Sequence, residues 1–358
     1  MKSKIFKYTL LFFTALLLVV GLYLYVKISA RLYPRPAIQD SETSIIGFNH
    51  VGITVKDLDV MLAFYQSATR FDLLDRSMIQ NNKSVNQLYG QDSMVYERAI
   101  LKGPNMLLEL TQFENQQDRD LSKMPPEGPG MTHTCYQSPD TKSGYQSFKK
   151  AGIEMLSRGD DPIDLGGYGV TYAYGHDPEG NMVELEQMSS TLIKLQIGSE
   201  FAEANPMWMT QVALISPDLS RLLDFYEKVL EIKPYRVGSY KDNPKFDEIG
   251  DRDNLAFDAG WFGLDSQGKK LELMQYVNPA TPAITTQRKL TDLGYNFSFE
   301  VEDIQKEYAR LQEHGIEFIS EPQKVDDFWS VFAKDPDGNF FSLRQAIDED
   351  SKYSLKNF

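Results

Sequence analysis

Apolar and polar residues alternate along several short stretches of the chain, which is the pattern of β-strands with one buried face. In FNHVGITV, residues 48–55, one face is apolar and the other carries His50. LLELTQF and MVELEQ alternate in the same way, with Glu109 and Glu184 opposite the apolar residues. These strands therefore present a histidine and two carboxylates on the face turned away from the core.

One longer apolar run lies at the N-terminus. Tyr8 to Val26 is uncharged and mostly apolar, and as a helix it would span about 28 Å, close to one bilayer core. Lysines precede it, and no clean small-residue cleavage site follows it. We expect an uncleaved membrane anchor within residues 1–32 and a polar tether at 33–44. The signal-like layout favours soluble domains outside the cytoplasm, in the periplasm.

The rest of the chain repeats itself. HVGITVKDLDVMLAFYQ at 50–66 is matched by QVALISPDLSRLLDFYE at 211–227, and LLELTQF is matched by KLELMQY. Each long repeat again divides into two units that open with a strand, continue through a helix and close with further strands. We therefore expect an α+β protein of four similar modules in two domains. The predicted domains are 45–190 and 207–347, joined by a linker at 191–206 and followed by an acidic tail at 348–358 of no clear role.

Matched positions within the modules select candidate functional residues. His133 lies seven residues before Asp140, as His50 lies seven before Asp57. Together with Glu109 and Glu184 they form a set of two imidazoles and two carboxylates on polar strand faces, which is more indicative of a site than any one of them alone. His176 and His314, beside a turn and at a helix end, are expected to be solvated.

A repeated turn delivers one member of this set. DPEGNMVE at 177–184 recurs as DPDGNFFS at 335–342, so the turn is common to both repeats. Pro and Gly suit the turn itself. The first copy ends in Glu184 and the second in Ser342, which indicates that the second repeat has lost, or never needed, this functional residue.

Composition and charge exclude several classes of function. The 358 residues are 42% apolar and 25% charged, which suits two globular domains. The net charge is −14, and no Lys/Arg-rich run follows the first 35 residues, so we expect no nucleic-acid partner. The single Cys135 excludes an intrachain disulfide and a CxxC zinc site.

The four modules, the DL…FY helix start, the LEL strand and the DPxGN ending resemble the vicinal oxygen chelate superfamily. This superfamily includes glyoxalase I, type I extradiol dioxygenases, methylmalonyl-CoA epimerase and bleomycin-resistance proteins. The resemblance covers nearly all of residues 45–347. It implies βαβββ modules that pair so that their sheets curl around a cleft holding one divalent metal ion.

Carried over residue by residue, the resemblance implies the metal ligands His50, Glu109, His133 and Glu184. Such ligands suit Zn, Ni or Mn, or Fe(II) in a dioxygenase. In a glyoxalase-like lyase or isomerase, the ion would stabilise an enediolate of a small oxygenated substrate while Glu109 or Glu184 carries the proton. No oligomer is required for this arrangement.

Two other activities remain open. His50, His133 and Glu184 form a two-His-one-carboxylate set suited to Fe(II) and dioxygen, although Glu109 would occupy a position that oxygen needs. The chain could also bind a small molecule without catalysis, as bleomycin-resistance proteins do. The glutathione-binding glyoxalases carry an Arg four residues after their first ligand, where this chain has Thr54 and Ile215, so a glutathione adduct is not the expected substrate.

The pairing of modules also remains open. The corresponding positions of the second repeat are Gln211, Glu272, Asn296 and Ser342, which make a poor divalent site on their own. Pairing within a domain would keep the four strong ligands together, and this is the arrangement we expect. Exchange between domains would instead bring Gln211 and Glu272 to His133 and Glu184, which is again a workable metal set.

Overall fold

The computed structural model describes residues 14, 16–18, 20–21 and 42–358, apart from 81, 115–120, 168 and 265–267. Most of the expected anchor therefore lies outside the described residues. Within the part that is described, no helix has the length and apolar character needed to cross a membrane.

The first repeat contains two modules. The elements of the first module are β1 (Ile45–Thr54), α2 (Leu58–Thr69), β2 (Asp72–Gln80), α3 (Lys83–Leu88), β3 (Val95–Lys102) and β4 (Leu107–Phe113). Those of the second are β5 (Gly130–Pro139), α4 (Gly144–Ala151), β6 (Glu154–Met155), β7 (Ile163–Asp164), β8 (Val170–His176) and β9 (Met182–Met188). The linker forms two short helices, α5 (Ser190–Gln196) and α6 (Ser199–Ala204).

The second repeat follows the same plan. Its third module consists of β10 (Trp208–Ile215), α7 (Leu219–Leu230), β11 (Arg236–Tyr240), α8 (Pro244–Gly250), β12 (Ala256–Gly263) and β13 (Lys270–Asn278). The fourth consists of β14 (Gly294–Val301), α9 (Ile304–Glu313), β15 (Gln323–Val325), β16 (Phe328–Lys334) and β17 (Phe340–Ala346), and η1 (Leu355–Asn357) ends the chain. Three of the four main helices begin directly after a repeated aspartate, because the side chains of Asp57, Asp218 and Asp303 accept hydrogen bonds from the first turn. The fourth, α4, begins after Ser143 rather than after Asp140.

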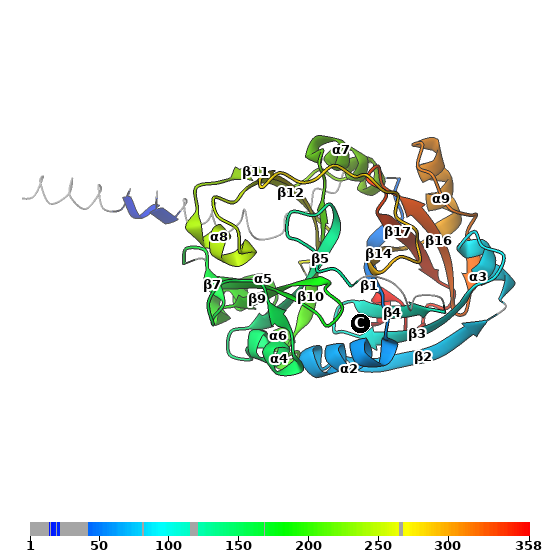
Figure 1. Ribbon diagram of the computed structural model, residues 1–358, viewed down its shortest axis with the longest axis horizontal. Helices are drawn as coiled ribbons and strands as arrows, with labels where there is room; N and C mark the ends of the chain where they lie inside the picture. The colour runs from blue at the N-terminus through cyan, green and yellow to red at the C-terminus, as the bar shows by residue number, and fades with distance from the viewer. Residues whose placement is uncertain are drawn as a thin grey trace, which may run out of the picture.

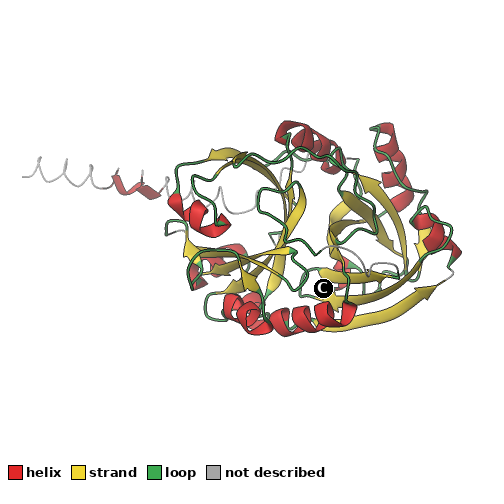
Figure 2. Cartoon of the chain, in the orientation of Figure 1, coloured by secondary structure: helices red, strands yellow, loops and turns green. Residues whose placement is uncertain are grey.

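The strands form two curled sheets, visible as two separate arcs of arrows in Figure 2. Sheet A has the order β15-β16-β17-β14-β1-β4-β3-β2. Sheet B has the order β11-β12-β13-β10-β5-β9-β8-β6, with β7 paired to β8. Each sheet therefore takes one module from each repeat.

The expected pairing within a repeat was wrong. The first module pairs with the fourth through antiparallel β1 and β14, with Val51 opposite Phe297. The second pairs with the third through antiparallel β5 and β10, with His133 opposite Ala213. Because all four opening strands share one apolar pattern, that pattern does not specify which strand lies beside which.

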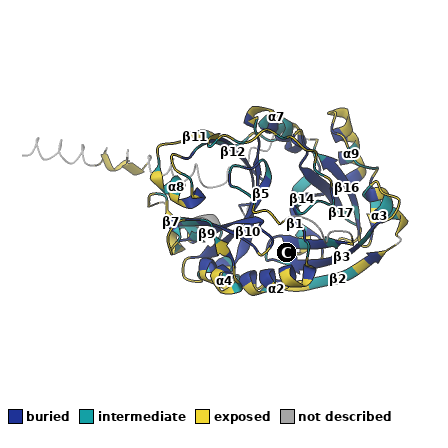
Figure 3. Cartoon of the chain, viewed as in Figure 1, coloured by how far each residue is buried: buried dark blue, intermediate teal, exposed yellow. Residues whose placement is uncertain are grey.

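Helices fill the space between the two sheets. Figure 1 shows α2 beside α4 along one edge of the molecule and α7 near α9 along the opposite edge. The largest hydrophobic cluster draws on all four modules, and its fully buried members include Phe48, Phe148, Leu222 and Leu311. Figure 3 shows the buried residues gathered on the strands and on the inner sides of these helices. Within the first repeat, the two modules meet through α2 and α4. Between the repeats, the modules meet through the paired strands β1–β14 and β5–β10, and also through α3 against β15 and α8 against β7 and β8.

The DPxGN turns join the modules of each repeat. Asp177 accepts hydrogen bonds from the backbone of Glu179 and Asn181, from the Asn181 amide and, at 2.8 Å, from the hydroxyl of Tyr65 on α2. Asp335 repeats this arrangement with Tyr226 on α7 at 3.2 Å. The conserved spacing of the turn in both repeats therefore reflects a structural role.

Candidate metal centre

Four polar side chains converge on the concave face of sheet B. His133 lies on β5 and Glu184 on β9, while Gln211 lies on β10 and Glu272 on β13. These strands are consecutive in the order β13-β10-β5-β9. The alternation along each strand turns the apolar neighbours toward the helices and these four residues toward the cleft.

Short distances connect the four residues. The Nε2 atom of His133 is 3.7 Å from a carboxylate oxygen of Glu184 and 3.5 Å from one of Glu272. The amide nitrogen of Gln211 donates to Glu184 and, at 3.0 Å, to Glu272. The indole nitrogen of Trp261 donates to the other oxygen of Glu272 at 2.7 Å, which fixes that carboxylate.

The electrostatics of the cluster reflect two carboxylates in one buried place. Burial, together with Glu186 and Glu272, raises the pKa of Glu184 well above its usual range. Burial acts on Glu272 as well, but His133 and Lys270 outweigh it and hold the pKa of Glu272 below its usual range. A cation placed between the two carboxylates would relieve their repulsion.

The cluster fits a divalent metal ion. One donor atom from each of His133, Glu184 and Glu272 lies within 4.8 Å of the others, and all three residues are buried. The Nδ1 atom of His133 is 2.9 Å from the Thr132 hydroxyl, whereas its buried Nε2 has no hydrogen-bond partner. Buried polar atoms are normally satisfied, so an imidazole nitrogen that faces two carboxylates without a hydrogen bond is the arrangement expected of a metal-binding site.

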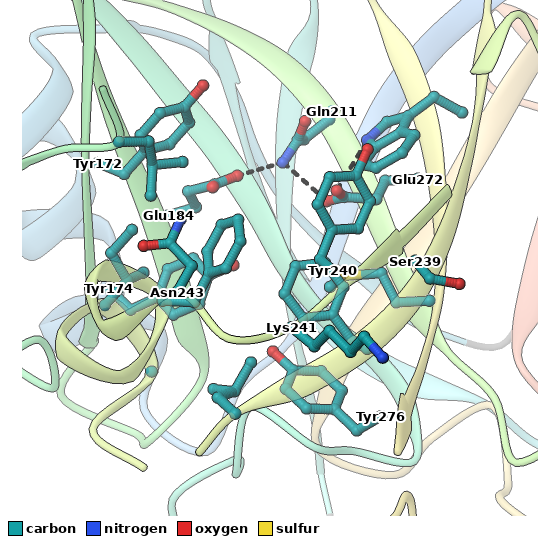
Figure 4. A pocket seen from close by; sticks show the side chains of 18 of the residues that line it. Tyr172, Tyr174, Glu184, Gln211, Ser239, Tyr240, Lys241, Asn243, Glu272 and Tyr276 are labelled. Atoms are coloured by element: carbon teal, nitrogen blue, oxygen red, sulfur yellow. Dashed lines mark hydrogen bonds between the residues drawn. The ribbon is translucent and has the colours of Figure 1, made fainter. Parts of the chain in front are cut away.

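A pocket of about 600 Å³ opens beside this cluster. Figure 4 shows Glu184, Gln211 and Glu272 joined by hydrogen bonds at one side of the pocket, with Tyr240 next to Glu272 and Tyr276 at the opposite side of the view. The walls are largely aromatic and are completed by Tyr172, Tyr174, Phe246, Phe257 and Trp261. Three cationic side chains, Arg236, Lys241 and Lys270, also line the pocket. This size and lining suit a small organic molecule.

His50 and Glu109 do not join this cluster, because both lie in sheet A. There, Arg344 on β17 is 3.1 Å from Glu109. Burial alone would raise the pKa of Glu109, but Arg344 and His50 outweigh it and lower that pKa to about 2. Burial and the Arg344 charge lower the pKa of His50 to about 3. A guanidinium thus supplies the positive charge in sheet A.

The remaining positions of the second repeat complete the sheet A cleft. Ser342 is fully buried, and Asn296 lies opposite Gly52 on the neighbouring strand. Neither supplies a charged ligand, so within the described residues no metal-binding cluster forms in sheet A. We expected one cleft to be built from the first repeat and the other from the second. Instead, the cleft of sheet B and the cleft of sheet A each contain residues from both repeats.

The two-His-one-carboxylate set is also separated, since His50 lies in one sheet and His133 with Glu184 in the other. The expectation for His176 was wrong as well. Its side chain is buried, with Nε2 2.8 Å from the carbonyl oxygen of Met124.

The comparison with protein families agrees with this architecture. The family model described as glyoxalase/bleomycin resistance protein/dioxygenase superfamily matches residues 47–185 and 208–343. The chain belongs to this superfamily. Its two matched regions coincide with the two repeats, so the resemblance seen in the sequence motifs is confirmed.

Individual relatives are more distant. A lactoylglutathione lyase of Oryza sativa subsp. japonica is 26% identical over 197 residues, which are 55% of this chain and 56% of the rice protein. The matched stretch thus spans little more than half of that relative. An uncharacterized Bacillus subtilis protein, YurT, is 37% identical over 82 residues, which cover 23% of this chain and 63% of YurT.

Solved structures share the fold. Glyoxalase I from Zea mays superposes with a TM-score of 0.56 at 20% identity, covering 84% of this chain and 92% of the maize chain. A putative dioxygenase from Bacillus subtilis superposes with a TM-score of 0.55 at 11% identity, covering 88% and 91% of the two chains.

Several residues of the site were not found from the sequence. Trp261 and Lys270 line the pocket. Trp261 stands in no repeated motif, and Lys270 opens the repeated KLELMQY strand without a role assigned to it. Glu186 lies on the same strand as Glu184 and was likewise assigned no role. Only the fold brings Trp261 and Lys270 beside His133 and Glu184, because the two pairs come from different repeats.

Proposed function

We propose that the chain is a metal-dependent lyase or isomerase of the glyoxalase type, acting on a small oxygenated substrate in the sheet B pocket. The supporting observation is the unpaired Nε2 of His133 between the carboxylates of Glu184 and Glu272. A divalent ion held by His133, Glu184 and Glu272, with the amide oxygen of Gln211 available as a further donor, would polarise substrate oxygens as a Lewis acid.

Other residues of the chain would position the ligands and transfer the proton. Trp261 and Gln211 fix Glu272 through hydrogen bonds. Glu184 accepts no hydrogen bond from Trp261, and it lines the pocket. We therefore assign proton transfer to Glu184. Glu109 loses the proton-carrying role considered for it, because it lies in sheet A and is paired with Arg344.

The pocket walls indicate the substrate's character. Aromatic side chains favour a flat or apolar body, and the three cations can receive an anionic group. Ile215 stands four residues after Gln211, where the glutathione-binding glyoxalases have an Arg. A thiol adduct other than that of glutathione, or a substrate without a thiol, therefore fits better.

Metal analysis of the purified full chain tests the proposal. We expect about one Zn, Ni or Mn ion per chain after dialysis, and its loss in Glu272→Gln and His133→Ala. Glu109→Gln is the matched control because Glu109 is the counterpart of Glu272 in the other repeat; this variant should keep the ion.

Activity assays separate the alternatives. Turnover of adducts of 2-oxoaldehydes with a panel of thiols, without oxygen uptake, supports the proposal. Fe(II)-dependent oxygen consumption with catechols would instead indicate a dioxygenase, although the histidine pair expected for that chemistry does not form. A metal-free protein whose small-molecule binding survives His133→Ala and Glu184→Ala would be a binding protein and not an enzyme.

A further inference from the structure

The C-terminal segment, residues 348–358, packs into the concave face of sheet A. The side chain of Tyr353 clusters with Ile100 and Leu107, and the residue is only 6% exposed. Its ring meets that of Phe328 edge-on, with centroids 6.1 Å apart. Figure 1 marks the C-terminus against β1, β3 and β4. The acidic tail of the sequence is thus a packed part of the second cleft.

Hydrogen bonds hold the segment in place. The Asn49 amide donates to the carbonyl oxygen of Tyr353 at 2.8 Å. The carboxylate of Glu300, which is buried on β14, accepts from the Ser354 hydroxyl at 2.6 Å and from the Leu355 backbone at 2.7 Å. The segment therefore makes specific polar contacts as well as apolar ones.

The segment covers the part of sheet A that corresponds to the pocket of sheet B. Ile100 lies opposite Glu109 in the strand register, as Trp261 lies opposite Glu272. Leu107 stands two residues before Glu109, as Lys270 stands two before Glu272. Trp261 and Lys270 line the sheet B pocket, whereas Tyr353 covers their counterparts. The chain's own tail thus occupies, in sheet A, the place that corresponds to the pocket of sheet B.

Unsatisfied polar atoms lie beside the segment. Among the described residues of this concave face, five buried atoms have no hydrogen-bond partner: Arg98 Nε, Ser330 Oγ, Ser342 Oγ, Arg344 Nε and Arg344 Nη1. The guanidinium carbons of Arg98 and Arg344 lie 5.9 and 3.9 Å from the centroid of the Phe328 ring. Tyr353 contacts this same Phe328 ring. The place of the Tyr353 ring therefore lies next to guanidinium nitrogens that have no hydrogen-bond partner.

We propose that the concave face of sheet A is a second ligand site, for a small aromatic carboxylate, which residues 348–358 occupy when the ligand is absent. The ligand ring takes the place of the Tyr353 ring on Phe328, Ile100 and Leu107. The carboxylate accepts hydrogen bonds from Arg344 and the neighbouring serines, because guanidinium and hydroxyl donors match its acceptor oxygens. The site does not involve the metal centre.

Calorimetric titration with phenylacetate tests the proposal on the full chain. Tyr353→Ala removes the competing ring, and we expect its sheet A site to bind one phenylacetate at least tenfold more tightly than in the unsubstituted chain. Cyclohexylacetate, which keeps the carboxylate but lacks the aromatic ring, should bind this site more weakly. Adding Arg344→Gln to Tyr353→Ala should abolish this gain in binding, while adding Tyr240→Ala, in the sheet B pocket, should leave the gain unchanged.

Two further measurements use the unsubstituted tail. A synthetic peptide of residues 348–358 should displace phenylacetate from the Tyr353→Ala chain, and the same peptide with Tyr353→Ala should not. In the unsubstituted chain, saturating phenylacetate should speed amide hydrogen exchange in residues 351–358; this measurement remains informative if the variants do not fold. Exchange that stays unchanged at saturation, or binding that is lost with Tyr240→Ala and kept with Arg344→Gln, would overturn the proposal.

Discussion

At the scale of single residues, the two clefts differ most at two matched positions on the last strand of a module. Sheet B carries Glu184 and Glu186 where sheet A carries Ser342 and Arg344, each pair two residues apart on the last strand of a module. The change replaces two negative charges with one positive charge. The concave face of sheet B is therefore the one suited to a divalent ion, while that of sheet A contains its own guanidinium cation.

Burial and the positive charge in sheet A should make the stability of the protein depend on pH through His50. Its folded pKa of about 3 lies below the ordinary 6.5, so the unfolded chain binds a proton that the folded chain does not between these values. Stability is then lost as pH falls below 6.5, by about 2 kcal/mol between pH 7 and pH 5 for this one group. We expect the free energy of unfolding of His50→Gln, measured by urea titration, to fall by about 2 kcal/mol less between pH 7 and pH 5 than that of the unsubstituted chain.

The matched control for this measurement is His314→Gln, because His314 is exposed at the end of α9. This variant should follow the unsubstituted chain. An equal pH dependence in His50→Gln and the unsubstituted chain would show that His50 is protonated normally in the folded protein.

At the scale of elements, the DPxGN turns connect helix to strand rather than build the site. Tyr65 on α2 and Asp177 before β9 belong to different modules of one repeat, and their hydrogen bond is buried. Burial raises the pKa of Asp177 to about 6. Below that pH the bond loses its charge-assisted character.

Tyr65→Phe should therefore destabilise the fold by about 1.5–3 kcal/mol at pH 8, the usual range for a hydrogen bond to a charged group. We expect a smaller penalty at pH 5, where Asp177 is protonated. The equivalent change Tyr226→Phe should cost less, since its hydroxyl lies 3.2 Å from Asp335. Chemical denaturation gives the free energies, and metal content should stay unchanged in both variants; loss of the ion from either would contradict a purely structural role.

At the scale of the whole molecule, the two repeats are not independent domains side by side. Each sheet is completed by strands of the other repeat, through β1 with β14 and β5 with β10. The candidate metal centre shares this dependence, because Glu272 and Gln211 come from one repeat and His133 and Glu184 from the other.

Cutting the chain at Gly198, between α5 and α6, tests this dependence. Residues 1–197 and 198–358 expressed separately would expose the unpaired edges of β1, β5, β10 and β14, and should aggregate or self-associate. Expressed together, they should form a one-to-one complex that binds one divalent ion. Light scattering with size-exclusion chromatography gives the masses. A single half that is monomeric and binds metal would contradict the exchange of modules.

The sequence by itself determined the four modules, their helix starts, the family, and the positions that could carry ligands. These features are local, since alternation, capping aspartates and turn residues act within a few residues of one another. Only the tertiary structure decided the pairing. The four opening strands have a similar alternation of side chains and offer similar edges, so the choice between them depends on contacts between residues far apart in the chain. That choice placed Glu272 rather than Glu109 beside His133, and it placed the C-terminal residues in the second cleft.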